Sequence, residues 1–269
     1  MRPATVAALR ALDHRFYLRH AAGFAGSRRL PWRGWTRALA ALRAPSGTLR
    51  VLDAGCAHGR LATYLADRYR DRKIDYWGLD ACLPLLVRAQ RALARQPRLV
   101  VRLAVGDLLA PLLRPPAIQE PCGGFDLIAL FGILHHIPGF RHRCALLRRL
   151  AALLAPQGRL VWTAWRVEQQ PGFARKRITW QAYNARANAR ANARAETPID
   201  PRDLEPGDHL LGWGDDRETP RYCHATSDRE AEKLSACTGL VEVDRFEAEG
   251  PSGDSNLYLV ATGQAGSAC

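Results

Sequence analysis

Apolar runs alternate with amphipathic stretches over the central part of this chain. Between the apolar runs, leucines recur at the spacing of a buried helix face over 60–69, 82–95 and 140–154. Alternation of this kind is typical of a parallel, doubly wound α/β sheet with helices on both faces. The apolar runs predicted to be strands are 49–55, 74–80, 98–107, 125–137 and 159–165.

The C-terminal part follows a different pattern. A helix is predicted over 228–237, and two alternating stretches, 240–250 and 255–263, are joined by the turn sequence PSGD. These features predict an antiparallel hairpin at the end of the sheet. A helical segment, 1–48, precedes the first strand.

Two stretches interrupt the alternation. Residues 111–124 form a Pro-rich loop, and residues 166–220 show little regular signal. The second stretch contains the run NARANARANARA at 184–195, in which Ala and Arg favour a helix and Asn does not. We expect a mobile insertion produced by repeat slippage; the alternative is a basic arm that lies on RNA.

The predicted organisation therefore has four parts. They are an N-terminal helical segment (1–48), a ligand-binding core (49–165), a basic low-complexity insertion (166–220), and a C-terminal helix and hairpin that complete the same domain (221–262).

The net charge of +13 is distributed unevenly. Residues 196–269 contain 6 Lys or Arg and 16 Asp or Glu, and subtraction from the totals of 39 and 26 leaves 33 and 10 for residues 1–195. A long positive surface attracts phosphate backbones, but a basic protein with no nucleic-acid partner has the same charge. The charge alone leaves both interpretations open.

The cysteines and the N-terminal sequence indicate the cellular compartment in which the protein is expected. The seven cysteines are scattered and form no C-x-x-C pair, which predicts free buried thiols in a reducing cytoplasm and no zinc or other metal site. The N-terminus lacks the unbroken apolar core of a secretory signal. No apolar run is long enough to cross a bilayer, so we expect a cytoplasmic protein without membrane association.

The most informative run is VLDAGCAHGRL, residues 51–61, which predicts a strand, a tight glycine turn and a helix start. Gly55 and Gly59 are four residues apart, so the G-x-G-x-x-G pattern of a dinucleotide site is absent and a nicotinamide oxidoreductase is disfavoured. The run resembles the first motif of the class I S-adenosylmethionine-dependent methyltransferases, D-x-G-C-G-x-G, with Ala57 in place of the middle glycine.

This resemblance implies a Rossmann-like, mostly parallel seven-stranded sheet with S-adenosylmethionine as the cofactor. Asp53 would accept from the ammonium group of the ligand, Asp80 from both ribose hydroxyls, and Asp107 from the adenine edge. Each acid alone is commonly a turn or helix-cap residue, but together they end successive strands at one sheet edge. The predicted cofactor-binding residues are Asp53, Gly55, Cys56, Ala57, Gly59, Asp80, Ala81, Gly106, Asp107, Leu108, Leu130 and Phe131.

A histidine doublet follows the fourth predicted strand. We expect His135 on the substrate side and His136 as a packed or hydrogen-bonded structural residue.

The flanking segments resemble a narrower group, the tRNA methyltransferases that esterify 5-carboxymethyluridine at the wobble position. The resemblance spans roughly residues 16–262. Its matching residues are Tyr17, Ala21 or Ala22, Phe24, Ser27, Arg28, Pro31, Trp32, Trp165, Glu168, Gln169, Asp208, Trp213, Arg221, Tyr222 and His224. The chain departs from that group at Ala57, Gly212 and Cys223, and in the Asn-Ala-Arg repeat.

This narrower resemblance implies tRNA as a partner and, by analogy with eukaryotic members, a small zinc-binding activator protein. An acceptor carboxylate is already ionised at neutral pH, so no general base would be needed. Arg28, Arg221 and His224 would hold the carboxylate, with Trp165 and Tyr222 stacking on a flipped base.

Two alternatives remain open. The first is a methyltransferase for a small metabolite, a quinone or a lipid-like acceptor. The second is a non-catalytic module that binds S-adenosylmethionine or RNA, which the presence of Asp53, Gly55, Gly59 and Asp80 disfavours.

Overall fold

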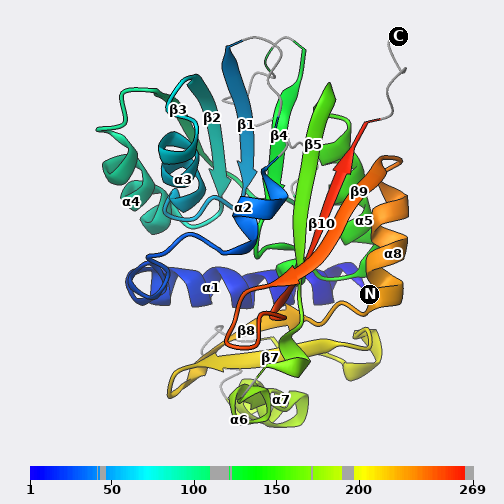
Figure 1. Cartoon of the computed structure of the whole chain (residues 1–269). Coiled ribbons are helices and arrows are strands. Elements are labelled where there is room, and N and C mark those ends of the chain that lie inside the picture. The colour runs from blue at the N-terminus through cyan, green and yellow to red at the C-terminus, as the bar shows by residue number, and fades with distance from the viewer. Residues whose placement is uncertain are drawn as a thin grey trace.

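The computed structural model describes residues 1–40, 42, 47–109, 121, 123–170, 172–189 and 197–263. Its main layer is a seven-stranded sheet with the order β3-β2-β1-β4-β5-β10-β9 (Figure 1). Strands β1 to β5 are parallel, and β10 runs antiparallel to both of its neighbours. This confirms the predicted fold class. The strands are β1 (Thr48–Ala54), β2 (Lys73–Asp80), β3 (Leu99–Val105), β4 (Phe125–Leu130), β5 (Leu154–Trp165), β9 (Val241–Ala248) and β10 (Asn256–Thr262).

Helices cover both faces of this sheet because its central strands are apolar on both sides. All six residues of β4 are buried. On one face, Leu61 and Leu65 pack into a cluster with Val51 and Tyr76. The helices on that face are α2 (Gly34–Ala38), α3 (Arg60–Arg68) and α4 (Leu83–Leu93), and those on the other are α5 (Phe140–Ala151) and α8 (Asp228–Cys237).

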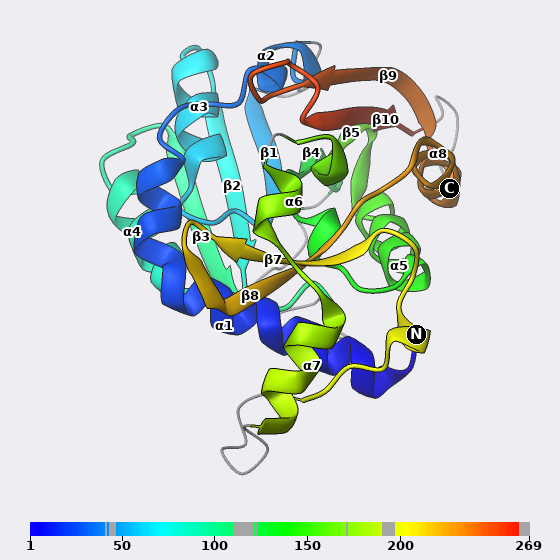
Figure 2. The ribbon, with the colours of Figure 1, turned by 90° about the horizontal axis from the view of Figure 1, so that it is seen from below.

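The longest helix, α1 (Pro3–Ser27), lies across the carboxyl edge of the large sheet. A second, three-stranded sheet lies on the far side of α1, with the order β6-β7-β8 (Figures 1 and 2). Leu9 and Leu12 of α1 pack into a buried cluster with Leu210 and Tyr222 of this small sheet. The small sheet therefore fixes α1 in place. Its strands are β6 (Arg177–Ile178), β7 (Asp208–Trp213) and β8 (Asp216–His224).

The expectation of little regular structure in 166–220 is wrong. The segment contains the small sheet, two short 3-10 turns (Val167–Gln169 and Pro201–Asp203), α6 (Phe173–Lys176) and α7 (Trp180–Ala189). Its order comes from contacts with distant residues, since Tyr183 and Ala187 of α7 are buried in the cluster that includes Leu9 and Leu12.

The first asparagine of the Asn-Ala-Arg run has a structural role. The Asn184 side chain donates to the carbonyl oxygen of Ile199 at 2.7 Å and accepts from its amide nitrogen at 2.8 Å. Residues 184–189 complete α7, whereas 190–195 lie outside the described residues, as does most of the predicted Pro-rich loop at 111–124. The expected boundary between residues 220 and 221 falls inside β8.

The fourth strand is shorter than predicted. It ends at Leu130 rather than at residue 137, because Gly132 takes a φ of +69° and turns the chain across the edge of the sheet. A 3-10 turn, Leu134–His136, follows. This turn places the histidine doublet at the carboxyl edge of the sheet.

The expectation that all cysteines are free thiols is also wrong. Cys144 of α5 and Cys237 of α8 form a disulfide, which joins the two helices on one face of the sheet. Cys56, Cys82 and Cys223 are buried free thiols. Cys122 and Cys269 lie outside the described residues.

Within the described ranges, no helix combines the length and the apolar character that a membrane span requires.

Candidate active site

A cavity of about 470 Å³ lies between the carboxyl ends of β1 to β4 and the helix α1. Three turns form its floor and are called the cofactor cradle here: residues 53–57, 80–82 and 106–108. The side of α1 that faces the cradle is called the acceptor wall. The acceptor wall consists of Ala7, Arg10, Ala11, Asp13, His14, Tyr17 and Phe24.

Most of the predicted cofactor-binding residues line this cavity. Those that do are Asp53, Gly55, Cys56, Ala57, Asp80, Ala81, Gly106, Asp107, Leu108 and Phe131. Gly59 and Leu130, the other two predicted residues, are absent from the lining. Gly59, at φ +81°, caps the start of α3, and Leu130 is fully buried in the core on the α5 face.

The glycine turn brings the backbone close to the next strand. Gly55 has a φ of +90°, and its amide nitrogen donates to the carbonyl oxygen of Leu79 at 2.7 Å. A Cβ at this position would lie 2.1 Å from Cγ1 of Ile133. Ala57 has a φ of +49°, a conformation that favours glycine. The alanine therefore retains the turn at some cost in backbone strain.

Asp53, at the end of β1, is held in a dry environment. Its carboxylate is 3% exposed and accepts from the Tyr76 hydroxyl at 2.6 Å. Burial raises the pKa of Asp53 from its ordinary value of 3.8 to about 7. A cationic ligand group beside Asp53 would favour the ionised form.

Asp80, at the end of β2, fixes the shape of the cradle. Its two oxygens accept from the amide nitrogens of Ala57 at 2.9 Å and Cys82 at 2.8 Å. Burial raises the pKa of Asp80, whereas these amide bonds oppose the rise. Each carboxylate oxygen keeps a second lone pair, which is available to a pair of ligand hydroxyls.

The third turn connects the cradle to the acceptor wall. Asp107 accepts from the amide nitrogen of Leu109 at 2.8 Å and forms an ion pair with Arg10 of α1. The side chains of Trp32, Trp35 and Phe131 form an aromatic wall of the same cavity, with ring centroids 5.6 to 6.0 Å apart. The cavity therefore combines polar groups near the strand ends with a large apolar surface.

The residues that line the acceptor side of the cavity differ from those that the sequence predicted. Of the six predicted residues on that side (Arg28, His135, Trp165, Arg221, Tyr222 and His224), Arg28 lines the cavity and the other five are absent from its lining.

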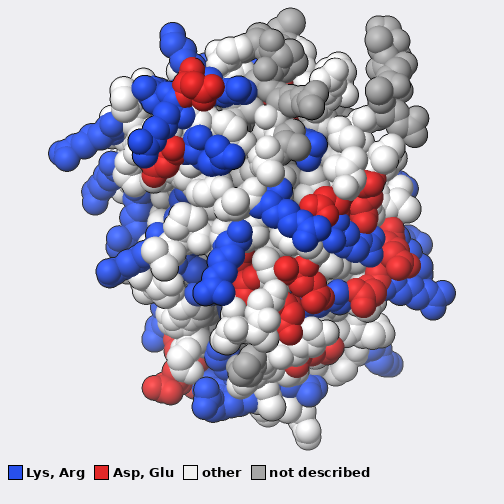
Figure 3. Space-filling model, in the orientation of Figure 1, with Lys and Arg blue, Asp and Glu red and all other residues white. Residues whose placement is uncertain are grey.

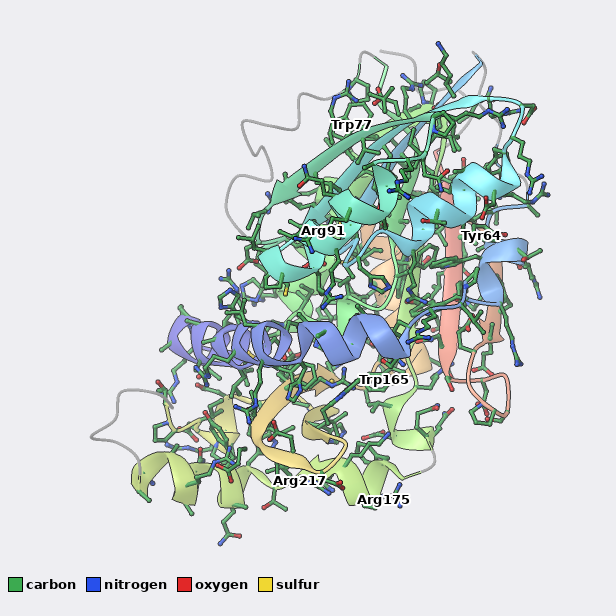
Figure 4. The ribbon with its side chains drawn as sticks, turned by 90° about the vertical axis from the view of Figure 1, so that its left-hand side faces the viewer. Tyr64, Trp77, Arg91, Trp165, Arg175 and Arg217 are labelled. Carbon is green, nitrogen blue, oxygen red and sulfur yellow. A yellow bond between two sulfur atoms is a disulfide. The ribbon has the colours of Figure 1, made fainter. Side chains whose placement is uncertain are left out.

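His135, Trp165 and Arg221 pack against one another on the far side of α1. The His135 ring centroid lies 4.8 Å from that of Trp165, and the Arg221 guanidinium lies 5.1 Å from the same ring. Figure 4 shows Trp165 next to α1, where β5 leaves the large sheet. Trp165 is therefore engaged in contacts with other residues of the chain.

His224 and Tyr222 belong to a buried ionic network. His224 lies 2.7 Å from both Asp208 and Glu230, and the Tyr222 hydroxyl donates to Asp208 at 2.7 Å. Arg143, which is fully buried, extends this network to Glu230 at 2.7 Å. These contacts explain why neither residue is available to a ligand in the cavity.

The acceptor wall contains the residues that sequence reasoning missed. Asp13 and His14 were not singled out, and Tyr17 was noted only through the resemblance. His136, rather than His135, lines the cavity, although the two rings lie only 4.1 Å apart. The available signal was the helical spacing of residues 10, 14 and 17, but any amphipathic helix has this spacing.

Two arginines line the cavity near the aromatic wall. The Arg60 guanidinium lies 5.8 Å from the Trp32 ring and 5.6 Å from the Trp35 ring, and it donates to the carbonyl oxygen of Leu30 at 2.7 Å. Burial and the neighbouring Arg28 lower the pKa of Arg60 to about 10. Burial and repulsion by Arg221 also lower the pKa of Arg28. This end of the cavity favours an anionic ligand group.

Two clusters have the residue types of a metal site. Their ligand atoms lie within 4.8 Å of one another. In the first cluster, the Arg221 cation lies near Cys223, and in the second, Arg143 and Tyr222 already satisfy the carboxylates. We assign no metal to either. The clusters are His135, His136 and Cys223, and Glu205, Asp208 and His224.

The uneven charge distribution is partly an internal feature. Basic residues before position 196 pair with acidic residues after it, as in Arg19 with Asp216 and Arg37 with Asp244. Figure 3 shows the molecule in the orientation of Figure 1. Basic side chains lie along its left, near α3 and α4, and mixed charges lie on the right, near β9 and α8. Part of the positive charge therefore stabilises contacts between distant segments. Further pairs are Arg2 with Asp200 and Asp203, Arg143 with Glu205 and Glu230, and Arg166 with Asp228 and Glu247.

Part of this chain is similar in sequence to known methyltransferases. Residues 52–160 match the family described as a methyltransferase domain. An uncharacterized methyltransferase of Mycobacterium tuberculosis (strain H37Rv) is 37% identical over 117 residues, which is 43% of this chain and 50% of the relative. An uncharacterized methyltransferase of Mycobacterium bovis matches to the same extent. The chain thus spans about half the length of these curated relatives.

Solved structures show the same fold over nearly the whole chain. The 1,6-didemethyltoxoflavin-N1-methyltransferase of Burkholderia thailandensis has a TM-score of 0.60 at 18% identity and covers 98% of this chain and 91% of its own. The CcbJ methyltransferase of Streptomyces caelestis has a TM-score of 0.59 at 17% identity and covers 94% and 99%.

The fold, the motif match and the cradle agree. Residues 52–160 match a methyltransferase domain, and the chain has the fold of S-adenosylmethionine-dependent methyltransferases of known structure. The predicted resemblance to tRNA wobble methyltransferases finds no support in these matches.

Proposed function

We propose that this protein is an S-adenosylmethionine-dependent methyltransferase whose methyl acceptor is a small molecule held between the cofactor cradle and the acceptor wall. One observation supports this most directly: a single cavity is lined by both sets of residues. Trp165 and Tyr222, the side chains expected to hold a nucleobase, are instead occupied by internal contacts.

The acidic and the aromatic residues of the cavity would have different roles. Asp53 and Asp80 would hold the ammonium and ribose groups of the cofactor, and Asp107 would hold its adenine. S-adenosylmethionine supplies an electrophilic methyl group, whose bond to sulfur breaks with the electron pair left on sulfur. The Trp32, Trp35 and Phe131 rings exclude water from an acceptor that must approach this methyl group in line.

The solved structures add support for a small acceptor. The Burkholderia thailandensis enzyme holds 1,6-didemethyltoxoflavin and S-adenosylhomocysteine, and it aligns with this chain over α1 as well as over the sheet, since 98% of the chain is covered. A shared fold does not name the acceptor. The small molecule bound by that enzyme supports the proposal of a small acceptor here.

The test follows the fate of a labelled methyl group. The protein is incubated with radiolabelled S-adenosylmethionine and a bacterial cell extract, which is then separated into RNA, protein and small-molecule fractions. We expect the label in the small-molecule fraction. An Asp80→Ala variant provides the control, because label transfer must depend on the cradle. Base-labile label in tRNA would contradict the proposal.

A tRNA substrate is the second candidate, and the excess of 33 basic over 10 acidic residues in 1–195 favours it. Retention on bulk tRNA that falls steeply with salt would support it. The third possibility, a non-catalytic module, predicts that calorimetry detects no binding of S-adenosylmethionine.

A further inference from the structure

Three side chains of the cavity lining, Tyr17, His136 and Asp13, lie in contact in that order. The Tyr17 hydroxyl lies 2.8 Å from Nε2 of His136, and Nδ1 of His136 lies 3.2 Å from Oδ2 of Asp13. All three residues line the cavity, and Asp13 and His136 are buried. None of them is needed to explain the cofactor cradle.

The surroundings determine which nitrogen of His136 bears the proton. Nδ1 lies 2.9 Å from the carbonyl oxygen of Tyr222, and a carbonyl oxygen only accepts. Nδ1 must therefore donate, which leaves Nε2 of the neutral ring as an acceptor for the Tyr17 hydroxyl. The amide nitrogen of Tyr222 donates to Oδ1 of Asp13 at 2.8 Å and fixes the carboxylate beside the ring.

Arg221 acts on the other end of the chain. Its guanidinium is buried against the rings of Phe16 and Trp213, and its Nε has no hydrogen-bond partner among the described residues. Burial raises the pKa of Tyr17, and the nearby Arg221 cation opposes the rise. Charge interactions with Cys223, Tyr17 and Asp13 raise the pKa of Arg221 in spite of its burial. Arg221 therefore favours negative charge on the Tyr17 oxygen.

We infer that Tyr17 and His136 form a proton relay that removes a proton from the methyl acceptor, with Asp13 and Arg221 as positioning residues. This inference rests on the proposed function and narrows its substrate class. The acceptor is a small molecule whose attacking atom bears a proton at neutral pH, such as a hydroxyl or a ring N–H group.

The proton balance is as follows. The bond between the acceptor oxygen or nitrogen and its hydrogen breaks, and the proton passes to the Tyr17 oxygen. The hydroxyl proton of Tyr17 passes at the same time to Nε2 of His136. The freed electron pair of the acceptor forms the bond to the methyl carbon, and the His136 imidazolium later releases its proton to solvent.

This relay separates two classes of acceptor. A carboxylate is already ionised and has no use for a base, whereas a phenol or ring N–H gains from one by about 10²- to 10⁴-fold. The charged and titratable groups that face His136 are Asp13, Tyr17, Asp80, His135 and, through Tyr17 and Asp13, Arg221. Any pH dependence of the relay belongs to this group as a whole.

The first arm of the test uses labelled S-adenosylmethionine with a panel of phenols, heteroaromatic N–H compounds and carboxylic acids. We expect transfer to an O–H or N–H acceptor. Tyr17→Phe and His136→Gln should lower its turnover by about 100-fold or more. Binding of S-adenosylhomocysteine, measured by calorimetry, should change by less than about threefold, which is well under 1 kcal/mol.

Matched controls address non-specific effects. Tyr69→Phe and His142→Gln remove the same groups from sites outside the cavity lining, and we expect both to retain wild-type turnover. Full turnover in Tyr17→Phe and His136→Gln would overturn the relay and leave the proposed function standing. Transfer to carboxylic acids alone would do the same.

The second arm needs neither cofactor nor acceptor. Nitrogen NMR of ¹⁵N-histidine-labelled protein, assigned by loss of the His136→Gln signal, should show a proton on Nδ1 and a hydrogen-bonded, unprotonated Nε2. Tyr17→Phe should change the Nε2 shift. A proton on Nε2 would overturn the relay. If only tRNA is labelled in the cell-extract experiment described under the proposed function, the proposed small-molecule function fails, and this NMR result still decides whether the relay exists.

Discussion

The cofactor cradle and the acceptor wall lie on opposite sides of one cavity, but they are built in different ways. Each turn of the cradle comes from one short segment directly after a strand, as in Asp53 to Ala57 after β1. The acceptor wall depends on α1, whose position is set by β8, which lies about 200 residues further along the chain. The cofactor side of the cavity is therefore built by residues close together in the sequence, whereas the acceptor side depends on contacts between residues far apart in it.

The largest effect should come from the ion pairs that join α5 to α8 and to the segment before β7. Arg143 is fully buried and pairs with Glu205 and Glu230 at 2.7 Å. Arg143→Met leaves these carboxylates without their cation, and it should lower the free energy of unfolding by about 3 kcal/mol. Chemical denaturation measures this loss. Arg148→Met, on the same helix, is the control and should change stability by less than about 0.5 kcal/mol. Equal effects would contradict the role of the network.

The second effect should be confined to the cradle. Gly55→Ala introduces a Cβ 2.1 Å from Ile133 at a φ of +90°. We expect a loss of about 2 kcal/mol in stability from backbone strain and steric overlap. The affinity for S-adenosylhomocysteine should fall by at least about tenfold, measured by calorimetry. Gly26→Ala, where a Cβ would meet nothing within 4 Å, serves as the control. A Gly55→Ala variant that binds normally would show that close backbone approach is unimportant here.

The third effect separates cofactor binding from folding. Asp80→Ala removes the acceptor for two amide bonds and the proposed ribose contact. Calorimetry should show at least about a tenfold loss of affinity, or about 1.4 kcal/mol. Asp80→Asn, which keeps one acceptor oxygen, should lose less. Unchanged binding in Asp80→Ala would remove Asp80 from the cradle.

The fourth effect is a pH dependence of the cradle. Because burial raises the pKa of Asp53 from 3.8 to about 7, the folded protein binds a proton that the unfolded chain has lost over this range. This contribution to stability is present below about pH 4 and fades as the pH rises to about 7. Cofactor affinity should change in the opposite direction, because the ammonium group requires the ionised carboxylate. Calorimetry between pH 5.5 and 7.5 should show rising affinity, and Asp53→Asn should abolish the dependence. Affinity that falls over this range would contradict the assignment.

The smallest effect tests the departure from the motif. Ala57→Gly removes a side chain from a residue at φ +49° and should raise the free energy of unfolding by about 0.5 kcal/mol. Thermal unfolding detects a change of this size as a small rise in Tm. Ala62→Gly, inside α3, should have the opposite sign, since glycine weakens a helix interior.

Local signals predicted the cradle well because each residue is adjacent to a strand end. Asp53, Asp80 and Asp107 were found in this way, and all three line the cavity. Predictions that needed contacts between distant segments did less well. His224 was interpreted as a substrate residue, but its carboxylate partners Asp208 and Glu230 come from two separate elements.

The histidine doublet shows the same division. The sequence placed both histidines after the fourth strand, but which of the two reaches the cavity depends on the 3-10 turn that follows Gly132. That turn exists because α1 and β8 pack over it, with Tyr17 and the Tyr222 carbonyl bonded to the His136 ring.

The sequence by itself determined the doubly wound sheet and placed the residues of the cradle at the ends of its strands. Hydrophobic period and a glycine turn are local properties, and the carboxyl ends of parallel strands must meet at one edge. Only the tertiary structure decided that 166–220 forms a sheet, that α1 becomes the acceptor wall, and that His136 rather than His135 faces the cavity. These outcomes depend on burial of apolar side chains and pairing of charges between segments far apart in the chain, and no local pattern encodes those contacts.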